Sequence, residues 1–239
     1  MMDVVSERGQ NVTPLDLWPC PIGLFNAGEG VRELNKLLVK DAFEEKTKER
    51  KRPSRTGVDV WQSVNTLQDK YESFQQLQQI LGGAVFAMMA RCGYKEEDLP
   101  KHAVTSLWAN ITESNYGFHQ PHIHGDGKCV WTGVYYPANM IYKDGPVYCE
   151  DLDKPIVDLL RPTSEPKPGD LIMYDPARIA KRAATPSYVD RYPYYAQEFC
   201  FTPREGACVL FPAWLEHSTS PHGFLGGTRM SISFAVLRT

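Results

Sequence analysis

The apolar residues of the chain follow two different periodicities, one before and one after Pro100. In the first part they recur every three or four residues, which is the spacing that places side chains on one face of an α-helix. The two stretches with this spacing are Val31, Leu34, Leu37 and Leu38, and then Leu67, Tyr71, Phe74, Leu77 and Leu81. The pattern predicts two amphipathic helices in the N-terminal part of the chain.

After Pro100 the sequence changes to short runs that are rich in β-branched and aromatic residues, which are typical of β-strands. The predicted strands are residues 103–112, 128–136, 170–175, 198–202, 207–211 and 228–237. Helices followed by strands indicate an α+β, mainly β fold, in which an antiparallel core (residues 101–239) is supported by a helical segment (residues 1–100). We expect one domain, 1–239, because β proteins often reach this length undivided.

Three segments depart from both patterns. Residues 14–26 mix apolar residues with prolines, which predicts an edge strand or an extended segment. Residues 151–169 and 176–197 are long, contain proline and show no periodicity, and we expect irregular loops that shape a substrate entrance. The tyrosines of residues 188–195 either line that entrance or pack on the core.

Charge and cysteine content exclude several classes of protein. A net charge of −3 and a pI near 6.1 give no overall field that would attract nucleic acid or an anionic membrane. The longest apolar run, residues 82–90, has about half the length of a membrane-spanning helix. The six cysteines form no C-x-x-C pair and the N-terminus carries no signal-peptide pattern, so we expect reduced thiols and a cytoplasmic protein.

Histidines gather at one point of the predicted core. His122, His124 and Asp126 alternate along a short stretch, and His217 follows the predicted strand 207–211. Side chains two residues apart on a strand share a face, so His124 and Asp126 can bind one ion together with His217. Two imidazoles and one carboxylate, with open positions beside them, form the metal site of non-heme Fe(II) oxygenases. We therefore predict His124, Asp126 and His217 as metal ligands and catalytic residues.

Other interpretations of these residues stay open. His122 can replace Asp126, which gives an all-imidazole site with His124 and His217; otherwise His122 supports a ligand through a hydrogen bond. Asp126 lies between two glycines, so a plain turn with its carboxylate in solvent is also possible. His222 fits a surface residue near a turn better than it fits a ligand.

An arginine follows the distal histidine on the next predicted strand. In the run 229–234, Arg229, Ser231 and Ser233 share one face. An arginine on the inner face of a barrel is costly unless an anion pairs with it. A guanidinium with a serine hydroxyl beside it suits a carboxylate, through bidentate, charge-assisted hydrogen bonds. Arg229 and Ser231 are therefore predicted to dock an anionic cosubstrate.

Taken together, these residues resemble the 2-oxoglutarate-dependent Fe(II) oxygenases, and more narrowly a group of bacterial and phage members of that superfamily. The resemblance covers most of the chain. Its motifs are LWPCPI (17–22), LWAN (107–110), PHIH (121–124), WTGVYY (131–136), YDP (174–176), FPAWLEH (211–217) and RMS (229–231). Residues 125–130 are also similar to the segment that follows the metal strand in prolyl hydroxylases.

One departure from the group concerns the first two ligands. The group usually passes from an H-x-H into the tyrosine-containing strand over a shorter span, and this chain carries two extra residues there. Counting back from Tyr136 places the ligand pair at His124 and Asp126. Counting forward from Trp108 places it at His122 and His124.

The resemblance implies a double-stranded β-helix, which is a jelly-roll or cupin-like fold, with Fe(II) near one mouth. It implies that 2-oxoglutarate binds the iron, and that the far carboxylate of this cosubstrate pairs with Arg229 and Ser231, aided by Tyr136. The expected dioxygenase uses O2 to hydroxylate an unactivated C–H bond of an amino acid, a peptide residue or a related small metabolite, and releases succinate and CO2. Its partners are then a small-molecule or peptidyl substrate and O2, with neither nucleic acid nor membrane.

Other outcomes and functions fit the same fold. Desaturation or cyclisation is possible at such a site, whereas Asp126 as a ligand argues against halogenation. A cupin-like metalloenzyme would bind its metal through His122, His124 and His217 and need no 2-oxoglutarate. A non-catalytic jelly-roll would bind a sugar or a protein, with its histidines serving structure.

Overall fold

The computed structural model describes residues 20–49, 53–124, 127–150, 155–162, 165–184, 196–223 and 227–238. Two long helices lie in its N-terminal part: α1 (Arg32–Lys48) and α2 (Glu72–Arg91). The periodic apolar residues form their buried faces, and Leu38, Phe74 and Leu77 are fully buried. Both predicted helices are confirmed. The second begins later than its pattern suggests, because Leu67 lies in a short 3-10 helix, η2 (Leu67–Asp69), and Tyr71 is extended.

The larger of the two main sheets has six antiparallel strands in the order β1-β12-β6-β14-β4-β3. Their bounds are β1 Gly23–Asn26, β3 Trp61–Gln62, β4 His102–Thr112, β6 Cys129–Tyr135, β12 Ala207–Pro212 and β14 Arg229–Arg238. The N-terminal segment supplies β1 and β3 as the two edges, so the strand predicted within residues 14–26 forms at the sheet edge. The helical segment and the β core therefore share one sheet.

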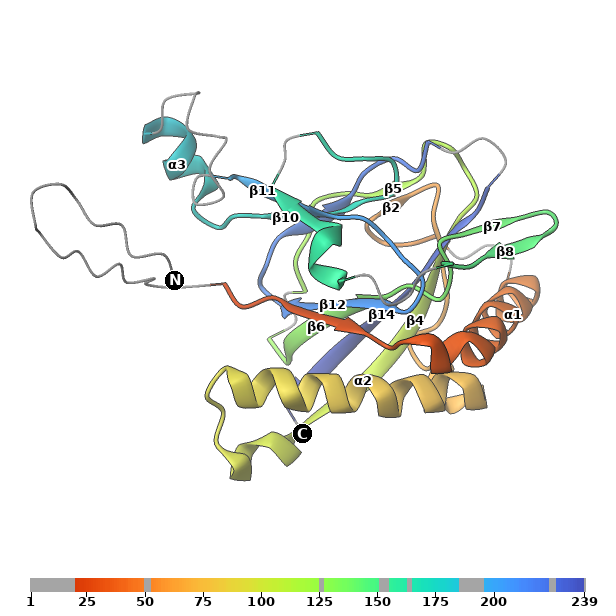
Figure 1. Cartoon of the computed structure of the whole chain (residues 1–239), viewed down its shortest axis with the longest axis horizontal. Helices are drawn as coiled ribbons and strands as arrows, with labels where there is room; N and C mark the ends of the chain where they lie inside the picture. Colours follow the sequence, from red (N-terminus) through yellow and green to blue (C-terminus); the bar gives the residue numbers. More distant parts are fainter. Residues whose placement is uncertain are drawn as a thin grey trace, which may run out of the picture.

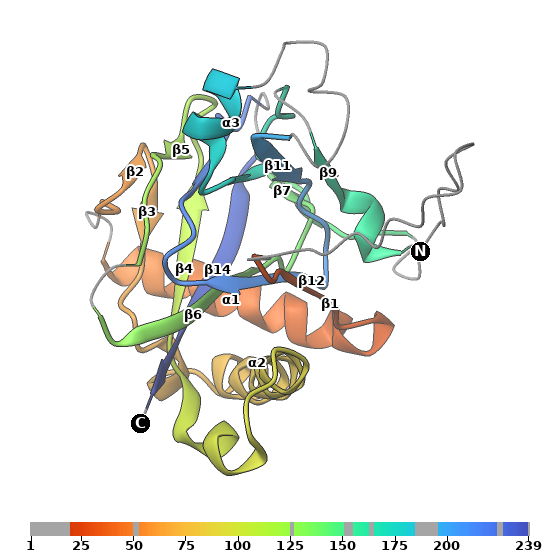
Figure 2. The same ribbon diagram turned by 90° about the vertical axis from the view of Figure 1, so that its left-hand side faces the viewer.

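Helices α1 and α2 cover one face of this larger sheet (Figures 1 and 2). Alternation along β14 explains the arrangement, since Met230, Ile232 and Phe234 are buried in the same core as the helix residues. Arg229 and Ser231 have the opposite alternation and line a cavity on the other face. The amphipathic helices thus close one side of the sheet and leave the polar side for chemistry.

The smaller main sheet faces that cavity side. It has the order β13-β10-β11-β9, with β9 Leu160–Pro162, β10 Leu171–Tyr174, β11 Glu198–Phe201 and β13 His217–Thr219. Two short pairs complete the strands: β2 (Gly57–Val58) with β5 (Phe118–His119), and β7 (Met140–Tyr142) with β8 (Gly145–Val147). A second apolar core, containing Tyr136, Met173, Phe201 and Phe211, joins the two sheets. Two facing antiparallel sheets with supporting helices are the predicted jelly-roll.

All six strands predicted after Pro100 are present, and no end differs by more than one residue from the one expected. The two segments expected to be irregular are not wholly so. Residues 151–169 include η4 (Ile156–Leu159) and β9, and residues 176–197 include α3 (Arg178–Ala184). The tyrosines of 188–195 lie outside the described residues. Among the residues described, no helix combines the length and apolar character that a membrane span requires.

Candidate metal centre and anion pocket

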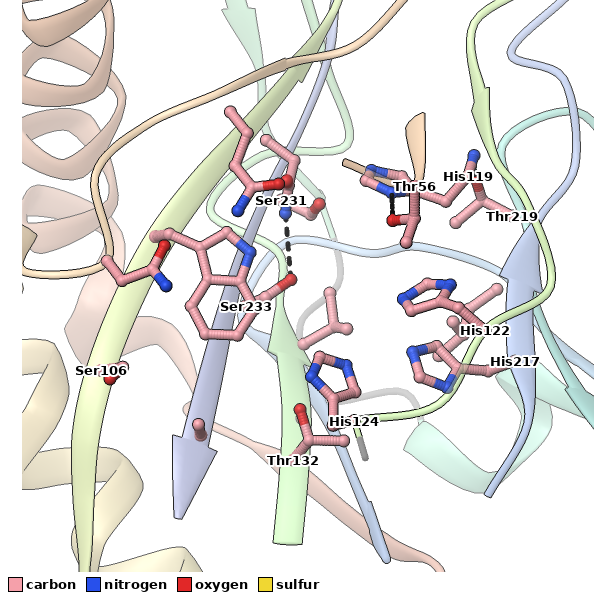
Figure 3. A pocket seen from close by; sticks show the side chains of 18 of the residues that line it. Thr56, Ser106, His119, His122, His124, Thr132, His217, Thr219, Ser231 and Ser233 are labelled. Atoms are coloured by element: carbon pink, nitrogen blue, oxygen red, sulfur yellow. Dashed lines mark hydrogen bonds between the residues drawn. The ribbon is translucent and has the colours of Figure 1, made fainter. Parts of the chain in front are cut away.

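Three histidines converge at the mouth between the two sheets. His122 and His217 form an antiparallel bridge, in which each backbone N–H donates to the other's carbonyl at 3.0 Å. The backbone N–H of His124 donates to the carbonyl of Ala213 at 2.9 Å, which ties the same segment to the chain before β13. One possible ligand atom from each of His122, His124 and His217 lies within 4.8 Å of the other two. Figure 3 shows the three imidazoles facing one another across this space.

Hydrogen bonds to backbone carbonyls set the protonation of two of these rings. Nδ1 of His122 bonds to the carbonyl of Gln120 at 2.7 Å, and Nδ1 of His217 bonds to that of Leu215 at 2.8 Å. A carbonyl only accepts, so Nδ1 must carry the proton in both rings. Nε2 is then left with a free lone pair, which is the form in which histidine binds a metal.

Burial keeps the same imidazoles neutral. Burial is the main cause that lowers the pKa of His217 well below its ordinary value, with the neighbouring His122 and His124 contributing. Burial also lowers the pKa of His122, against the opposing effect of its bond to Gln120. Neutral imidazoles at close quarters offer lone pairs without competing protons, and a divalent cation fits this donor set.

Among the predicted ligands, the structure therefore brings together His124 and His217, with His122 as their neighbour. Asp126 lies outside the described residues, so its predicted role as a ligand stays a prediction. His119 stands beside the cluster, its ring centroid 6.0 Å from that of His122. It is hydrogen-bonded to Thr56 at 3.1 Å, and its pKa is lowered to about 3, mainly by burial.

The interpretation of His222 as a surface residue is wrong. Its side chain is fully buried, and Nε2 bonds to the carbonyl of Gly227 at 3.1 Å. The segment that follows β13 is bonded to the turn before β5, since the backbone N–H of His222 donates to the carbonyl of Gly117 at 3.2 Å. This contact helps to bury a histidine that the Pro and Gly beside it place near a turn. A turn pattern predicts backbone direction but not the depth at which the turn lies.

Arg229 lies buried in the same cavity as the histidines. Its Nε donates to the carbonyl of Gly169 at 3.0 Å, and its Nη1 donates to the hydroxyl of Ser231 at 3.4 Å. Gly169 has a φ of +79°, a left-handed backbone that favours glycine, and a Cβ there would lie 3.4 Å from Cδ of Arg229. Within the described part of the chain, no acidic side chain forms an ion pair with Arg229. A buried cation in this state favours an anionic ligand.

Tyr136 completes this predicted anion pocket. Its ring centroid lies 5.5 Å from the guanidinium carbon of Arg229, and its fully buried hydroxyl makes no hydrogen bond of good geometry with the described residues. Burial raises its pKa to about 12, against the opposing charge of Arg229. At neutral pH the hydroxyl is protonated and able to donate to a carboxylate. The three residues predicted to bind the cosubstrate are thus neighbours.

One cavity of about 360 Å³ holds both the histidines and this pocket. Its wall contains two residues of the LWAN motif to which the sequence patterns assigned no role in the site. Trp108 lies with its ring centroid 6.0 Å from that of His124, and Asn110 donates to Ser233 at 3.0 Å. The Oδ1 atom of Asn110 is buried without a partner among the described residues. Alternation along β4 would have placed Trp108 and Asn110 on the face of Ser231, had the pairing with β14 been known.

Comparisons with known proteins agree with this geometry. A family model described as "Putative 2OG-Fe(II) oxygenase" matches residues 106–235. The chain belongs to this family. The family description names both Fe(II) and 2-oxoglutarate, and the three clustered histidines fit a metal ion. The predicted resemblance and both predicted cofactors are therefore confirmed. A search of curated proteins finds no match.

Solved structures show the same fold at low sequence identity. A prolyl-4-hydroxylase from Pseudomonas putida is 12% identical, with a TM-score of 0.54 over 92% of this chain and 94% of that one. The viral collagen prolyl hydroxylase of Paramecium Bursaria Chlorella virus-1, in a 2OG complex, is 10% identical, with a TM-score of 0.52 and coverage of 92% and 97%. The alpha-ketoglutarate-dependent carbocyclase SnoK from nogalamycin biosynthesis is 13% identical, with a TM-score of 0.56 and coverage of 91% and 79%. The jelly-roll prediction is confirmed.

Proposed function

We propose that this 2OG-Fe(II) oxygenase hydroxylates an unactivated C–H bond of an amino acid, a peptide residue or a related small metabolite, with succinate and CO2 as co-products. The observation that carries the proposal is one cavity that holds both a cluster of neutral imidazoles and a buried arginine without an acidic partner in the described residues. A metal ligand set and a carboxylate site in one cavity suit a cosubstrate with a keto-acid end and a far carboxylate. The cytoplasmic location and the lack of a nucleic-acid partner stay predictions from charge and cysteine content.

We assign the metal to His122, His124 and His217, because these are the ligand atoms that the described structure brings within 4.8 Å. The sequence predicts Asp126 as the third ligand, with His122 as the alternative, and Asp126 lies outside the described residues. Fe(II) held there would supply the oxidising power for C–H cleavage when 2-oxoglutarate and O2 are present. Three protein ligands leave positions open for these molecules.

The chain's own residues then bind and orient. The guanidinium of Arg229 and the hydroxyl of Ser231 would bind the far carboxylate of 2-oxoglutarate, and the hydroxyl of Tyr136 would donate to the same group. The carbonyl of Gly169 holds the guanidinium in place from the other side. Trp108, with Val134 and Leu171, which line the same cavity, would keep water from the reacting C–H bond.

The function is tested by Fe(II)-dependent formation of succinate from 2-oxoglutarate, in the wild type and in Arg229→Ala and Arg229→Lys. Loss of charge-assisted hydrogen bonds worth about 1.5–3 kcal/mol should raise the KM for 2-oxoglutarate in Arg229→Ala by about 10- to 100-fold. Arg229→Lys keeps the positive charge but loses the bidentate geometry of the guanidinium. Its KM for 2-oxoglutarate should therefore lie between that of the wild type and that of Arg229→Ala.

Turnover that is unaffected in Arg229→Ala would contradict the cosubstrate assignment. Absence of succinate formation in the wild type itself would favour the alternative of a three-histidine metalloenzyme that needs no 2-oxoglutarate, since the imidazole cluster alone fits both enzymes.

A further inference from the structure

A second hollow opens beside the metal centre. It has a volume of about 510 Å³ and shares His122 and Ile123 with the inner cavity. Its remaining lining comes from β10, α3, the turn between these two elements and the segment before β13: Tyr174, Pro176, Arg178, Ile179, Trp214 and Glu216. No role in binding iron or 2-oxoglutarate has been assigned to these residues, so the hollow needs an explanation of its own.

Large apolar side chains are exposed on the wall of this hollow. Ile123 is 52% exposed, Trp214 is 54% exposed and Ile179 is 79% exposed. An isolated exposed apolar residue needs no explanation, but a group of them around one hollow marks a surface that binds an apolar partner. We call Ile123, Ile179 and Trp214 the apolar rim.

Two members of the apolar rim are fixed to the metal ligands by the backbone. Ile123 lies between His122 and His124, and Trp214 precedes His217 by three residues. The bridge between His122 and His217 and the bond from His124 to Ala213 hold both segments side by side. A group that packs on Trp214 is therefore held at a defined place relative to the metal centre.

The charged groups of the hollow are paired with each other. Arg178 forms an ion pair with Glu216 at 2.5 Å, and its guanidinium lies 4.7 Å from the centroid of the Tyr174 ring. The hydroxyl of Tyr174 is hydrogen-bonded to Ser218 at 2.8 Å. Because these polar groups already have partners, the hollow suits an apolar occupant rather than an ion.

We propose that the prime substrate is a polypeptide, and that the hollow binds an apolar side chain next to the residue that is oxidised. This inference rests on the proposed function. The inner cavity of about 360 Å³ has the volume of a site for small molecules. The cosubstrate and the reacting side chain would together occupy it. A free amino acid would end there. An extended chain advances about 3.3–3.6 Å per residue, so a neighbouring residue of a polypeptide reaches the adjoining hollow.

The test measures peptide binding and turnover separately. Full-length protein with Fe(II) and 2-oxoglutarate under anaerobic conditions is mixed with a pool of acetylated, amidated hexapeptides, and the retained peptides are identified by mass spectrometry. We expect the wild type to retain peptides with a large apolar residue at a fixed offset from one common position. Trp214→Ala should bind them about 10-fold or more weakly, as for an aromatic residue at the centre of an interface.

Two further variants control for folding and for general stickiness. Ile179→Ala should weaken the same peptides by less, because this side chain is the most exposed of the apolar rim. Phe86→Ala removes a side chain of similar exposure, 49%, from α2 and should change neither binding nor succinate release. None of these changes empties a buried site, so all three variants should fold.

The outcomes separate this inference from the proposed function. Succinate release by a wild type that retains no peptide, or equal retention by Trp214→Ala, overturns the polypeptide subsite. Stimulation of succinate release by free amino acids alone does the same. If the wild type retains peptides that Trp214→Ala does not, but forms no succinate under air, the peptide subsite is supported and the proposed hydroxylation is refuted.

Discussion

At the scale of single residues, a substitution of Tyr136 distinguishes a role in ligand binding from a role in stability. Its buried hydroxyl has no hydrogen bond of good geometry with the described residues, which is costly in the free protein. We predict that Tyr136→Phe leaves the free energy of unfolding unchanged or slightly higher, and raises the KM for 2-oxoglutarate by about 5- to 10-fold, the equivalent of one hydrogen bond. Urea denaturation and succinate kinetics measure the two effects. A large loss of stability with an unchanged KM would make the hydroxyl structural.

The residues of the site differ in how far the sequence predicts them. Arg229 and Ser231 follow from strand alternation, and His217 follows from its place after the buried strand 207–211. The ligand that accompanies His124 does not follow, since the choice between His122 and Asp126 depends on the register of a short stretch with two extra residues. Register there is set by the backbone bridge from His122 to His217, a contact across 95 positions of the sequence. No local pattern encodes such a contact.

At the scale of the elements, two glycines should respond oppositely to alanine. Gly133 lies in β6, where an added Cβ would meet Cζ of Phe234 at 2.4 Å and the carbonyl of Val209 at 2.6 Å. Gly82 lies in α2, where nothing stands within 4 Å. We predict that Gly133→Ala destabilises the protein by about 1–3 kcal/mol through overpacking, and that Gly82→Ala stabilises it by up to about 1 kcal/mol through helix propensity. Chemical denaturation of both variants checks the pair; a neutral Gly133→Ala would refute the close packing of β6 on β14.

The length of an element decides whether the sequence predicts it. Long helices and strands repeat their periodicity often enough to be recognised, as α1, α2, β4 and β14 do. The strand β9 and the helix α3 have three and seven residues, and they lie in proline-containing segments without a visible period. Their structure comes from tertiary contacts, such as the pairing of β9 with β11, and not from local pattern.

At the scale of the whole molecule, we predict that a buried thiol and a buried tyrosine hydroxyl make the protein less stable at alkaline pH. Burial raises the pKa of the Cys208 thiol above its ordinary value of 9.0, and burial likewise raises the pKa of Tyr135. Below about pH 8 both groups are neutral in the folded and the unfolded chain. Above it the unfolded chain loses these protons first, so the free energy of unfolding falls as pH rises, by up to about 1.4 kcal/mol per pH unit for each group.

Urea denaturation between about pH 8 and pH 10.5 measures this slope. Cys208→Ala removes one of the groups and should give a shallower fall than the wild type over the same range. An identical slope in both proteins would mean that the Cys208 thiol does not stay protonated in the fold.

The central claim, that three imidazoles of this jelly-roll hold the catalytic iron, is tested most directly by anaerobic calorimetry with Fe(II). The wild type should bind one ion, His122→Ala and His217→Ala should lose at least about 10-fold in affinity, and Asp126→Ala should bind as the wild type does. Loss of binding in Asp126→Ala with retention in His122→Ala would restore His124 and Asp126 as the ligand pair. Unchanged binding in His217→Ala would contradict the metal centre itself.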